Sequence, residues 1–438
     1  MNFERMKALL LDLAIRGELV SQKPEEGWVD QIGAKPEVMP FAIPESWKWV
    51  QLKNVGQIVG GGTPKTSEPD YWNGDISWIT PADLGKNSSK WIHKGVKSIT
   101  RKGLKESSAK LMPSGSVVYS SRAPIGHIAI AGQELCTNQG CKSFVPNDQY
   151  ITTEWAYYML IARTKDIQSR ASGTTFKEIS GKGVGETWIT LPSQAEQRRI
   201  VAKLEEAFVE IDRAEKAYEE LQTLAGVLRG QILQEAIQGK LVPQLAEEGV
   251  VEQIGEVTSR IPFTIPEKWK WVQLKSVGQI VGGGTPKTSV ADYWGDEISW
   301  VTPADLGKNS SKWIHSGAKS ITRKGLDESS AKLMPEGSVV YSSRAPIGHI
   351  AIAGQELCTN QGCKSFVPNT DLITTEWAYY MLIARTKDIQ SRASGTTFKE
   401  ISGKGMGETW IALPPPGEQQ RIVTKIEDLL NLVDALTA

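Results

Sequence analysis

The sequence is poor in the residues that carry metal, redox or disulfide chemistry, with four cysteines and four histidines among 438 residues. Four cysteines are too few for a disulfide scaffold of this length. No run of about 18 apolar residues occurs, and Asp12 and Arg16 interrupt the apolar start of the chain. We therefore expect neither a signal peptide nor a membrane span. These absences predict a soluble, cytoplasmic protein with reduced thiols.

An excess of charge of either sign is also missing, because 50 Lys and Arg balance 50 Asp and Glu. This balance excludes a highly charged tail protein and a disordered chain. Taken alone, it argues against a nucleic-acid binder, which usually has a basic excess. The apolar content of 40% is enough for packed cores, and the length predicts two or three domains.

What the sequence does contain is a repeat of domain size. Residues 115–147 are identical to residues 337–369, and residues 151–192 differ from their second copy at only two positions, always at a spacing of 222. Such a unit is far longer than a solenoid repeat of roughly 20–50 residues. The shared residues include Trp47, His93, His127, Cys136, Cys141 and Trp188, which recur as Trp269, His315, His349, Cys358, Cys363 and Trp410.

The same register continues outside the two domains. Residues 14–20 resemble residues 236–242, and residues 196–201 resemble residues 418–423. The repeating unit is therefore a helix, a domain and a helix. The central segment, residues 195–240, is one continuous copy of what the two termini supply in two pieces.

The central segment carries a heptad pattern with charged residues in most other places, which is typical of a coiled coil. It would be roughly 65 Å long as a helix. The terminal runs at residues 3–15 and 418–436 are marginal helices alone, so we expect them to pack against it as an antiparallel pair. The alternative is a solvated connector helix. The predicted seam and partner surface consists of Leu204, Ile211, Tyr218, Leu221, Leu228, Ile232, Ile422 and Ile426.

The remaining sequence predicts an α+β fold with two mostly-β domains. Short β-like runs at residues 115–119 and 127–130 alternate with glycine and proline turns, and a capped apolar stripe predicts a helix at residues 153–164. We expect linkers at residues 21–39 and 243–261 to be loose. The predicted segments are residues 1–20 (first part of the distal helix), 40–192 (first domain), 193–242 (central helix), 262–414 (second domain) and 415–438 (last part of the distal helix).

Motifs for catalysis are missing from the sequence. Residues 60–66 resemble a phosphate loop, but Pro64 stands where such a loop needs glycine before its lysine, and no dinucleotide fingerprint follows a strand. Cys136 and Cys141 are better interpreted as buried thiols than as zinc ligands. A Ser121–His127 nucleophile pair has no third member. We therefore expect no catalytic residue and no metal.

The neutral total conceals an uneven distribution of charge. Residues 85–145 hold ten basic residues against two acidic ones, whereas residues 196–220 hold eight acidic residues against five basic ones. The second copy, at residues 307–367, has eight basic and four acidic residues. Basic domains on an acidic or mixed spacer indicate DNA on the domains and protein on the spacer.

Polar, glycine-rich loops of the domains are the candidate readers of base edges and phosphates. For each loop the alternative is an ordinary turn. The candidate DNA-contacting residues are Thr63, Lys65, Thr66, Asp83, Lys86, Asn87, Ser88, Lys90, Ser121, Arg122, Asn138, Gln139, Thr174, Thr175 and Lys177, with Thr285, Lys287, Thr288, Asp305, Lys308, Asn309, Ser310, Lys312, Ser343, Arg344, Asn360, Gln361, Thr396, Thr397 and Lys399 in the second copy.

Four blocks of residues resemble the specificity subunit of type I restriction–modification systems, and the likeness covers essentially the whole chain. The blocks are residues 49–52 with 61–64 and 71–78; residues 119–126; residues 173–175 with 178–180; and residues 191–192 with 196–201. The fourth block, which opens the long helix, is the most specific. All four recur in the second copy.

The resemblance implies two target-recognition domains held apart by paired helices, and a subunit without a catalytic site. It also implies double-stranded DNA, two methyltransferase subunits and restriction subunits as partners, with S-adenosylmethionine, ATP and Mg²⁺ bound only by those partners. Family members generally carry two different recognition domains, whereas here the two are nearly the same. We therefore expect an inverted-repeat target. The alternative function is a protein-interaction or ligand-binding scaffold on a coiled coil; a self-contained nuclease or methyltransferase lacks its motifs.

Overall fold

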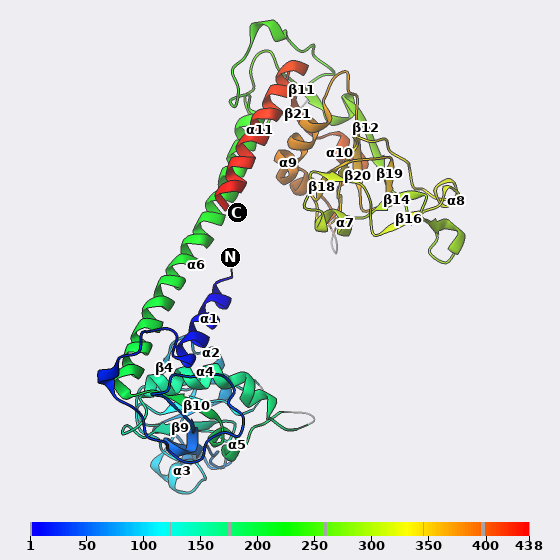
Figure 1. The fold of residues 1–438 in the computed structure, drawn as a ribbon. Helices are drawn as coiled ribbons and strands as arrows, with labels where there is room; N and C mark the ends of the chain where they lie inside the picture. Colours follow the sequence, from blue (N-terminus) through cyan, green and yellow to red (C-terminus); the bar gives the residue numbers. More distant parts are fainter. Residues whose placement is uncertain are drawn as a thin grey trace. The chain divides into compact units, whose positions relative to one another are not determined.

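The computed structural model describes residues 2–122, 124–173, 177–257, 261–344, 346–395 and 399–437. The chain forms two compact units, Met1–Tyr218 and Glu219–Ala438. The long helix α6 (Gln194–Ile237) contributes its first part to one unit and its remainder to the other (Figure 1). Each unit contains the same parts in the same order.

The first unit begins with one helix and ends with the start of α6. Its helices are α1 (Phe3–Arg16), α2 (Pro81–Lys86), α3 (Arg101–Lys105), α4 (Thr153–Ser169) and α5 (Gly181–Gly185), with short 3-10 turns at Pro24–Glu26, Leu52–Asn54 and Pro69–Tyr71. Its strands are β1 (Lys48–Gln51), β2 (Gly56–Gly60), β3 (Trp72–Ile79), β4 (Trp91–Ile92), β5 (Lys97–Ile99), β6 (Val117–Tyr119), β7 (Ile128–Ala131), β8 (Leu135–Thr137), β9 (Lys142–Pro146) and β10 (Trp188–Leu191).

The second unit repeats this order and ends with α11 (Pro416–Thr437). Its other helices are α7 (Pro303–Lys308), α8 (Arg323–Asp327), α9 (Thr375–Arg392) and α10 (Gly403–Gly407), with 3-10 turns at Ala246–Glu248, Leu274–Ser276 and Ala291–Tyr293. Its strands are β11 (Lys270–Gln273), β12 (Gly278–Gly282), β13 (Trp294–Gly295), β14 (Ile298–Val301), β15 (Trp313–Ile314), β16 (Lys319–Ile321), β17 (Val339–Tyr341), β18 (Ile350–Ala353), β19 (Leu357–Thr359), β20 (Lys364–Pro368) and β21 (Trp410–Leu413).

The strands of each unit form small mixed sheets. In the first unit the orders are β2-β9-β6-β7-β4, β5-β3-β8 and β1-β10. The β3–β8 and β4–β7 pairs are parallel and the other pairs are antiparallel. The second unit has the corresponding sheets, with β13 and β14 in place of the single bulged strand β3. The predicted α+β class with mainly antiparallel strands is confirmed.

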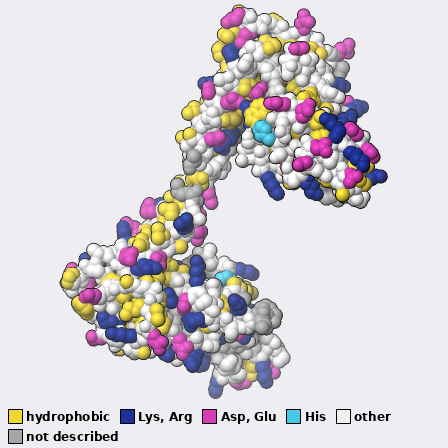
Figure 2. Space-filling model, turned by 45° about the vertical axis from the view of Figure 1, so that its right-hand side comes forward, with side chains coloured by type: hydrophobic (Ala, Val, Ile, Leu, Met, Phe, Trp, Pro, Cys, Tyr) yellow, Lys and Arg dark blue, Asp and Glu magenta, His cyan; other side chains and the backbone are white. Residues whose placement is uncertain are grey.

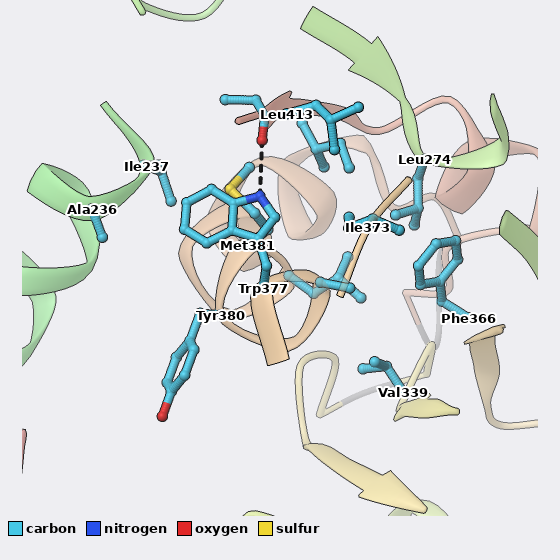
Figure 3. Close-up of a cluster of buried hydrophobic side chains, with 14 of the residues drawn as sticks. Ala236, Ile237, Leu274, Val339, Phe366, Ile373, Trp377, Tyr380, Met381 and Leu413 are labelled. Carbon is cyan, nitrogen blue, oxygen red and sulfur yellow. Dashed lines mark hydrogen bonds between the residues drawn. The ribbon is translucent and has the colours of Figure 1, made fainter. Parts of the chain in front are cut away.

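The predicted helix at residues 153–164 is confirmed and extends to Ser169. The hydroxyl of Thr152 accepts a hydrogen bond from the Trp155 backbone N–H at 3.3 Å, which caps the helix start. In the second unit the equivalent helix α9 places Trp377 at the centre of the core, where Ala236 and Ile237 of α6 pack from one side (Figure 3). The Trp377 indole N–H donates to the Ala412 carbonyl oxygen at 3.1 Å. The long helix is therefore part of the domain core and not a separate rod.

The terminal helices pack antiparallel to α6 within their own units, as predicted. In the first unit Lys7 of α1 pairs with Asp212 of α6 at 2.7 Å. The corresponding pair in the second unit, 222 positions later, joins Arg229 of α6 to Asp434 of α11 at 2.5 Å. Figure 1 shows α1 beside the first part of α6 and α11 beside its last part. The two units therefore repeat their contacts as well as their elements.

Only one line of the predicted heptad seam is buried. Leu204, Ile211 and Ile232 have relative exposures of 0, 7 and 5%, whereas Leu221 and Leu228 are 37 and 42% exposed. Ile422 and Ile426 are buried, and Tyr218 is half-buried with its ring 6.1 Å from that of Phe3. A single partner helix covers one line of side chains.

Parts of the linkers predicted to be loose make specific contacts with the long helices. Arg199 of α6 donates to both carboxylate oxygens of Glu26, at 2.6 and 2.7 Å. The second unit repeats this pair with Arg421 and Glu248 at 2.7 and 2.6 Å. The sequence pattern underestimated the linkers because their partners lie about 170 residues away on the helix. Within the described residues, no helix has the length and apolar character needed to cross a membrane.

Candidate nucleic-acid interface

Three neighbouring strands of the five-stranded sheet end at the same edge. The pairing of Gly60 with Lys142 places the end of β2 beside the start of β9. The bridge between Ser120 and Cys141 places the end of β6 on the other side of β9. Because the sheet order is β2-β9-β6, the loops after β2, before β9 and after β6 meet there.

Glycine allows the first of these loops to approach the next one closely. A Cβ on Gly61 would overlap the Asn138 carbonyl oxygen, and a Cβ on Gly62 would overlap the backbone at Ala109. The triple glycine that resembles a phosphate loop therefore serves backbone packing. It directs Thr63 toward the β8–β9 turn, where its hydroxyl donates to the Gln139 side chain.

A fourth segment joins this edge through Arg122. A backbone bridge connects Arg122 to Glu178, and the Ile179 N–H donates to the Ser121 carbonyl at 3.0 Å. The Arg122 Nε atom donates to Glu178 Oε2 at 2.9 Å, and Lys142 Nζ lies 3.4 Å from Glu178 Oε1. We call Thr63, Arg122, Gln139, Lys142 and Glu178 the loop cluster.

The second unit contains the same loop cluster. It consists of Thr285, Arg344, Gln361, Lys364 and Glu400. Arg344 Nε donates to Glu400 Oε2 at 2.8 Å, and Lys364 Nζ lies 3.2 Å from Glu400 Oε1. Thr285 donates to Gln361, as Thr63 does to Gln139. The arrangement is therefore a property of the repeated sequence.

The charges of the loop cluster are partly shielded from water. The Arg122, Glu178 and Lys142 side chains have relative exposures of 47, 35 and 17%. Partial burial raises the pKa of the Glu178 carboxyl, but hydrogen bonds and charge from Arg122 and Lys142 outweigh it and hold the pKa below its ordinary value of 4.5. Glu178 is therefore an anion at neutral pH, and the cluster carries one net positive charge.

Several predicted DNA-contacting residues lie in or beside the loop cluster with free access to solvent. Lys65, Thr66, Gln139 and Lys177 are exposed, and the same holds for their second-copy equivalents Lys287, Thr288, Gln361 and Lys399. Thr63 and Thr285 are half-exposed. The predictions at Thr174, Thr175, Thr396 and Thr397 lie outside the described residues.

Other predicted contacts take part in hydrogen bonds within the fold. Ser121 is fully buried and donates to the Gly140 carbonyl at 3.1 Å, and Ser343 does the same to Gly362 at 3.0 Å. Asn138 Oδ1 accepts from the Gly140 N–H at 2.9 Å and shapes the β8–β9 turn, as Asn360 does with Gly362.

Asp83 likewise has a structural role at the start of α2. Its carboxylate accepts from the Thr80 N–H and hydroxyl at 2.8 and 2.6 Å, and from the Val96 N–H at 3.0 Å. Asp305 repeats all three bonds in the second unit. A carboxylate with three donors is a capping group and has little capacity left for a base edge.

In the loop after α2 some side chains are exposed to solvent and one contacts the long helix of the same unit. Lys86 and Ser88 are exposed, as are Lys308 and Ser310, and the Asn87 and Asn309 amides donate within their own loops. Lys90 instead pairs with Glu205 of α6, and Lys312 pairs with Glu427 of α11 at 2.5 Å. Each of these lysines therefore connects its domain to the neighbouring helix of the same unit.

The predicted division into basic domains and an acidic spacer is less sharp in space than along the chain. Figure 2 shows lysine, arginine, aspartate and glutamate side chains interspersed over both units on the face drawn. In the first unit Lys102 is 3.3 Å from Asp70, and Arg101 is 3.8 Å from Asp75. The sequence count overlooked these acidic partners because they precede the counted segment.

Sequence reasoning did not select Lys142 and Glu178, although Arg122 was predicted. Arg122 and Glu178 are 56 positions apart, so no local pattern relates them. Residues 178–180 belong to one of the blocks that resemble the family and recur in the second copy, and this recurrence could have pointed to Glu178.

The cysteines pack in separate apolar clusters. Cys141 belongs to one with Val118 and Leu135, and Cys136 belongs to another with Trp78 and Ile99. Burial raises the pKa of each thiol to about 12, which disfavours the thiolate that a metal needs. Among the described residues, no three His, Cys, Asp or Glu side chains gather into a metal-binding group.

The repeated domains, the helix that links their cores and the loop clusters define a two-domain recognition protein. Residues 44–223 and 266–438 match the type I restriction modification DNA specificity domain, so the chain belongs to this family. A specificity subunit of the type I restriction enzyme MjaIX of Methanocaldococcus jannaschii is 37% identical over 172 residues, which cover 39% of this chain and 40% of that protein. The EcoR124I/EcoR124II specificity subunit of Escherichia coli is 30% identical over 38% of this chain and 42% of its own length. The matches thus span about two fifths of these two relatives.

Other relatives match over nearly their full length. The putative MjaX specificity subunit of Methanocaldococcus jannaschii is 24% identical across 90% of this chain and 88% of its own. The HsdS subunit from Thermoanaerobacter tengcongensis has a similar fold, with a TM-score of 0.60 and 23% identity, covering 91% of this chain and 92% of its own. A chain from a structure of a type I restriction–modification complex has a TM-score of 0.68, also at 23% identity, and covers 91% of this chain and 93% of its own.

Proposed function

We propose that this chain is the DNA-recognition subunit of a type I restriction–modification complex and that each unit reads one half of a split target. The observation that carries this proposal is the duplication of the loop cluster with the same hydrogen bonds in both units. Polar and basic side chains on closely packed loops are suited to base edges and phosphates. Family membership supports the same conclusion.

Because the two loop clusters have the same residues, the two half-sites have the same sequence. Two like units within one chain favour a two-fold symmetric mode of DNA binding. The target is then an inverted repeat interrupted by an unspecified spacer, with half-site centres about one helical turn apart. Differences between the copies, such as Lys94 for Ser316 and Lys105 for Asp327, alter charge and not the loop cluster. They weaken phosphate contact by the second unit without changing its choice of bases.

The chain itself performs no chemistry in this proposal. Two methyltransferase subunits flip and methylate adenine with S-adenosylmethionine, and restriction subunits use ATP and Mg²⁺ to cleave. In the second unit Leu221, Leu224, Val227 and Leu228 of α6 are between 37 and 65% exposed. Exposed apolar side chains on a spacer helix suit a protein partner, and we assign them to the methyltransferase subunits.

Sequencing of methylated adenines in a host that carries the chain with its partner subunits tests the proposal. The expected result is one interrupted motif that reads the same on both strands. Two unrelated half-sites would contradict the symmetry of the proposal. Methylation that is unchanged when this chain is deleted would contradict the function itself. A host with the Arg122→Ala and Arg344→Ala variant is the matched control, because methylation should then lose its motif.

A binding experiment separates the proposal from a protein-interaction scaffold. The complex of this chain with its methyltransferase subunits should bind DNA with an affinity that decreases steeply with salt, because phosphate contacts release counterions. A scaffold would show no such dependence.

A further inference from the structure

We propose that Glu178 and Glu400 are positioning residues that orient Arg122 and Arg344 so that each arginine reads a guanine. This inference rests on the proposed function, because it concerns how the loop cluster selects its half-site. The glutamates belong to no predicted DNA contact, and their own charge repels phosphate. Their place within the loop cluster therefore needs a different explanation.

The first observation is which edge of the arginine the glutamate occupies. Arg122 uses its Nε to donate to Glu178 at 2.9 Å, and Arg344 does the same to Glu400 at 2.8 Å. Among the described residues, neither arginine makes another side-chain hydrogen bond. The two terminal NH₂ groups therefore remain available as a pair of parallel donors. A guanine presents two acceptors, O6 and N7, to such a pair in the major groove.

The second observation is that the glutamate is itself held in place. Its backbone bridges Arg122, and the next residue, Ile179, donates to the Ser121 carbonyl. Its other carboxylate oxygen faces Lys142, which also donates to the Gln139 carbonyl at 2.9 Å. An arginine side chain has about 2 kcal/mol of rotamer entropy to lose. A fixed acceptor at Nε removes much of that freedom before DNA binds.

The third observation is that Glu178 also limits binding to any DNA. Lys142 is only 17% exposed and is paired with the glutamate, so its charge is largely neutralised. Without Glu178, two unpaired cations would face the phosphates of any sequence. The same carboxylate therefore favours the correct base and disfavours indiscriminate contact. Both effects raise the ratio of specific to non-specific affinity.

The test uses the complex of the full chain with its methyltransferase subunits. Its affinity is measured at several salt concentrations, for a duplex with the motif identified by methylation sequencing and for a scrambled duplex. The variant carries Glu178→Gln and Glu400→Gln. The ratio of the two affinities should fall about 100-fold, or about tenfold for each guanine. Affinity for the scrambled duplex should rise, with a steeper salt dependence. Because any misfolded fraction affects both duplexes equally, the ratio remains informative.

The matched control carries Glu186→Gln and Glu408→Gln. These residues pair with Lys182 and Lys404 at 3.8 and 3.9 Å in the neighbouring short helices, outside the loop cluster. The control substitutions remove the same negative charge from each unit, and the ratio of specific to non-specific affinity should stay unchanged. If the Glu178 variant strengthens binding to both duplexes equally, the glutamate is only an electrostatic brake and the inference is wrong.

Two further measurements address the arginine and the base. In the background of Arg122→Ala and Arg344→Ala, the glutamate substitutions should cause no additional loss of selectivity. Replacement of the half-site guanines by 7-deazaguanine, which lacks the N7 acceptor, should weaken binding of the unmodified complex and not of the arginine variant. A motif without guanine overturns the inference while the proposed function stands. An unmodified complex that binds both duplexes equally overturns the proposed function instead.

Discussion

Removal of the buried carboxylate of Glu196 should loosen the attachment of the first domain to its spacer helix. Glu196 lies in the first turn of α6 with 3% exposure. Its Oε2 accepts from the Trp47 indole N–H at 2.9 Å, and its Oε1 accepts from the Gln22 amide at 2.7 Å. One side chain therefore connects the helix, the domain core and the linker.

The expected magnitude follows from these two bonds. In Glu196→Ala the buried Trp47 indole loses its acceptor, which costs about 1–3 kcal/mol for an unsatisfied buried donor. With the loss of the second bond, we expect destabilisation of about 3 kcal/mol. For a unit of this size that corresponds to a decrease in Tm of roughly 6–12 °C. Glu196→Gln keeps a neutral acceptor and should cost less than about 1 kcal/mol.

The two variants should also differ in their response to pH. Burial raises the pKa of the Glu196 carboxyl above its ordinary value of 4.5, so the folded state holds this proton more tightly than the unfolded state. Stability from this group is therefore greatest below pH 4.5 and declines as pH rises from there to the raised pKa. The glutamine variant should lack this decline.

Thermal unfolding followed by near-ultraviolet circular dichroism, between pH 4 and 8, measures both effects. Glu206→Ala is the matched control, because this helical glutamate is 65% exposed and pairs with the nearby Lys203 of the same helix. It should change stability by less than about 0.5 kcal/mol. If the glutamine variant is as unstable as the alanine variant, the hydrogen-bond reasoning is refuted, since charge would then be what matters.

Three further changes test other parts of the fold. Thr190→Ala removes the hydroxyl that donates to the Ile15 carbonyl at 2.9 Å, and should lower unfolding free energy by about 1 kcal/mol in denaturant titrations; no change would show that water replaces the bond. Leu204→Ala should lower the free energy of unfolding by about 2–5 kcal/mol, and Leu221→Ala by less than about 0.5 kcal/mol. Leu221→Ala should instead weaken methyltransferase binding in a pull-down titration. Equal losses of stability would mean that both lines of the seam are covered. Arg199→Ala removes the guanidinium that pairs with the linker carboxylate Glu26, and limited proteolysis within residues 21–39 should become several-fold faster. An unchanged rate would indicate that other contacts hold the linker.

Features that depend on local sequence were predicted well. The capping threonine and apolar stripe predicted α4, and the spacing of 222 predicted two units with the same elements. The pairing of the terminal helices with α6 followed from that register, because the ends of the chain supply what the centre already contains.

Features that depend on distant partners were not predicted. Ser121 belongs to a polar loop, yet the Gly140 carbonyl 19 positions later takes its hydroxyl into the interior. Lys90 lies in a basic run, yet Glu205 draws it to the helix 115 positions away. The loop cluster itself forms where three strands end, and that juxtaposition depends on sheet order, which no periodicity in the sequence encodes.

The near-identity of the two copies has a consequence for how the chain folds. The closing strands β1 and β11 share the sequence KWVQ, and β10 and β21 differ only at Thr190 and Ala412. The correct pair β1–β10 closes a loop of 137 positions, from Gln51 to Trp188, whereas the incorrect pair β10–β11 closes one of only 79, from Leu191 to Lys270. Loop entropy alone favours the incorrect pair by about 0.5 kcal/mol.

Early formation of α6 reverses that preference. Its 44 residues lie inside the shorter loop, and as a helix they form a rod of roughly 66 Å. To pair β11 with β10, the 33 positions from Ile237 to Lys270 would then have to span the length of the helix back to its first residue. That distance is about twice the random-coil dimension of such a segment. A helix forms in microseconds or less, well before long-range strands pair. We therefore expect the spacer helix to act during folding as a kinetic guide that disfavours the exchange of strands between the two like sheets.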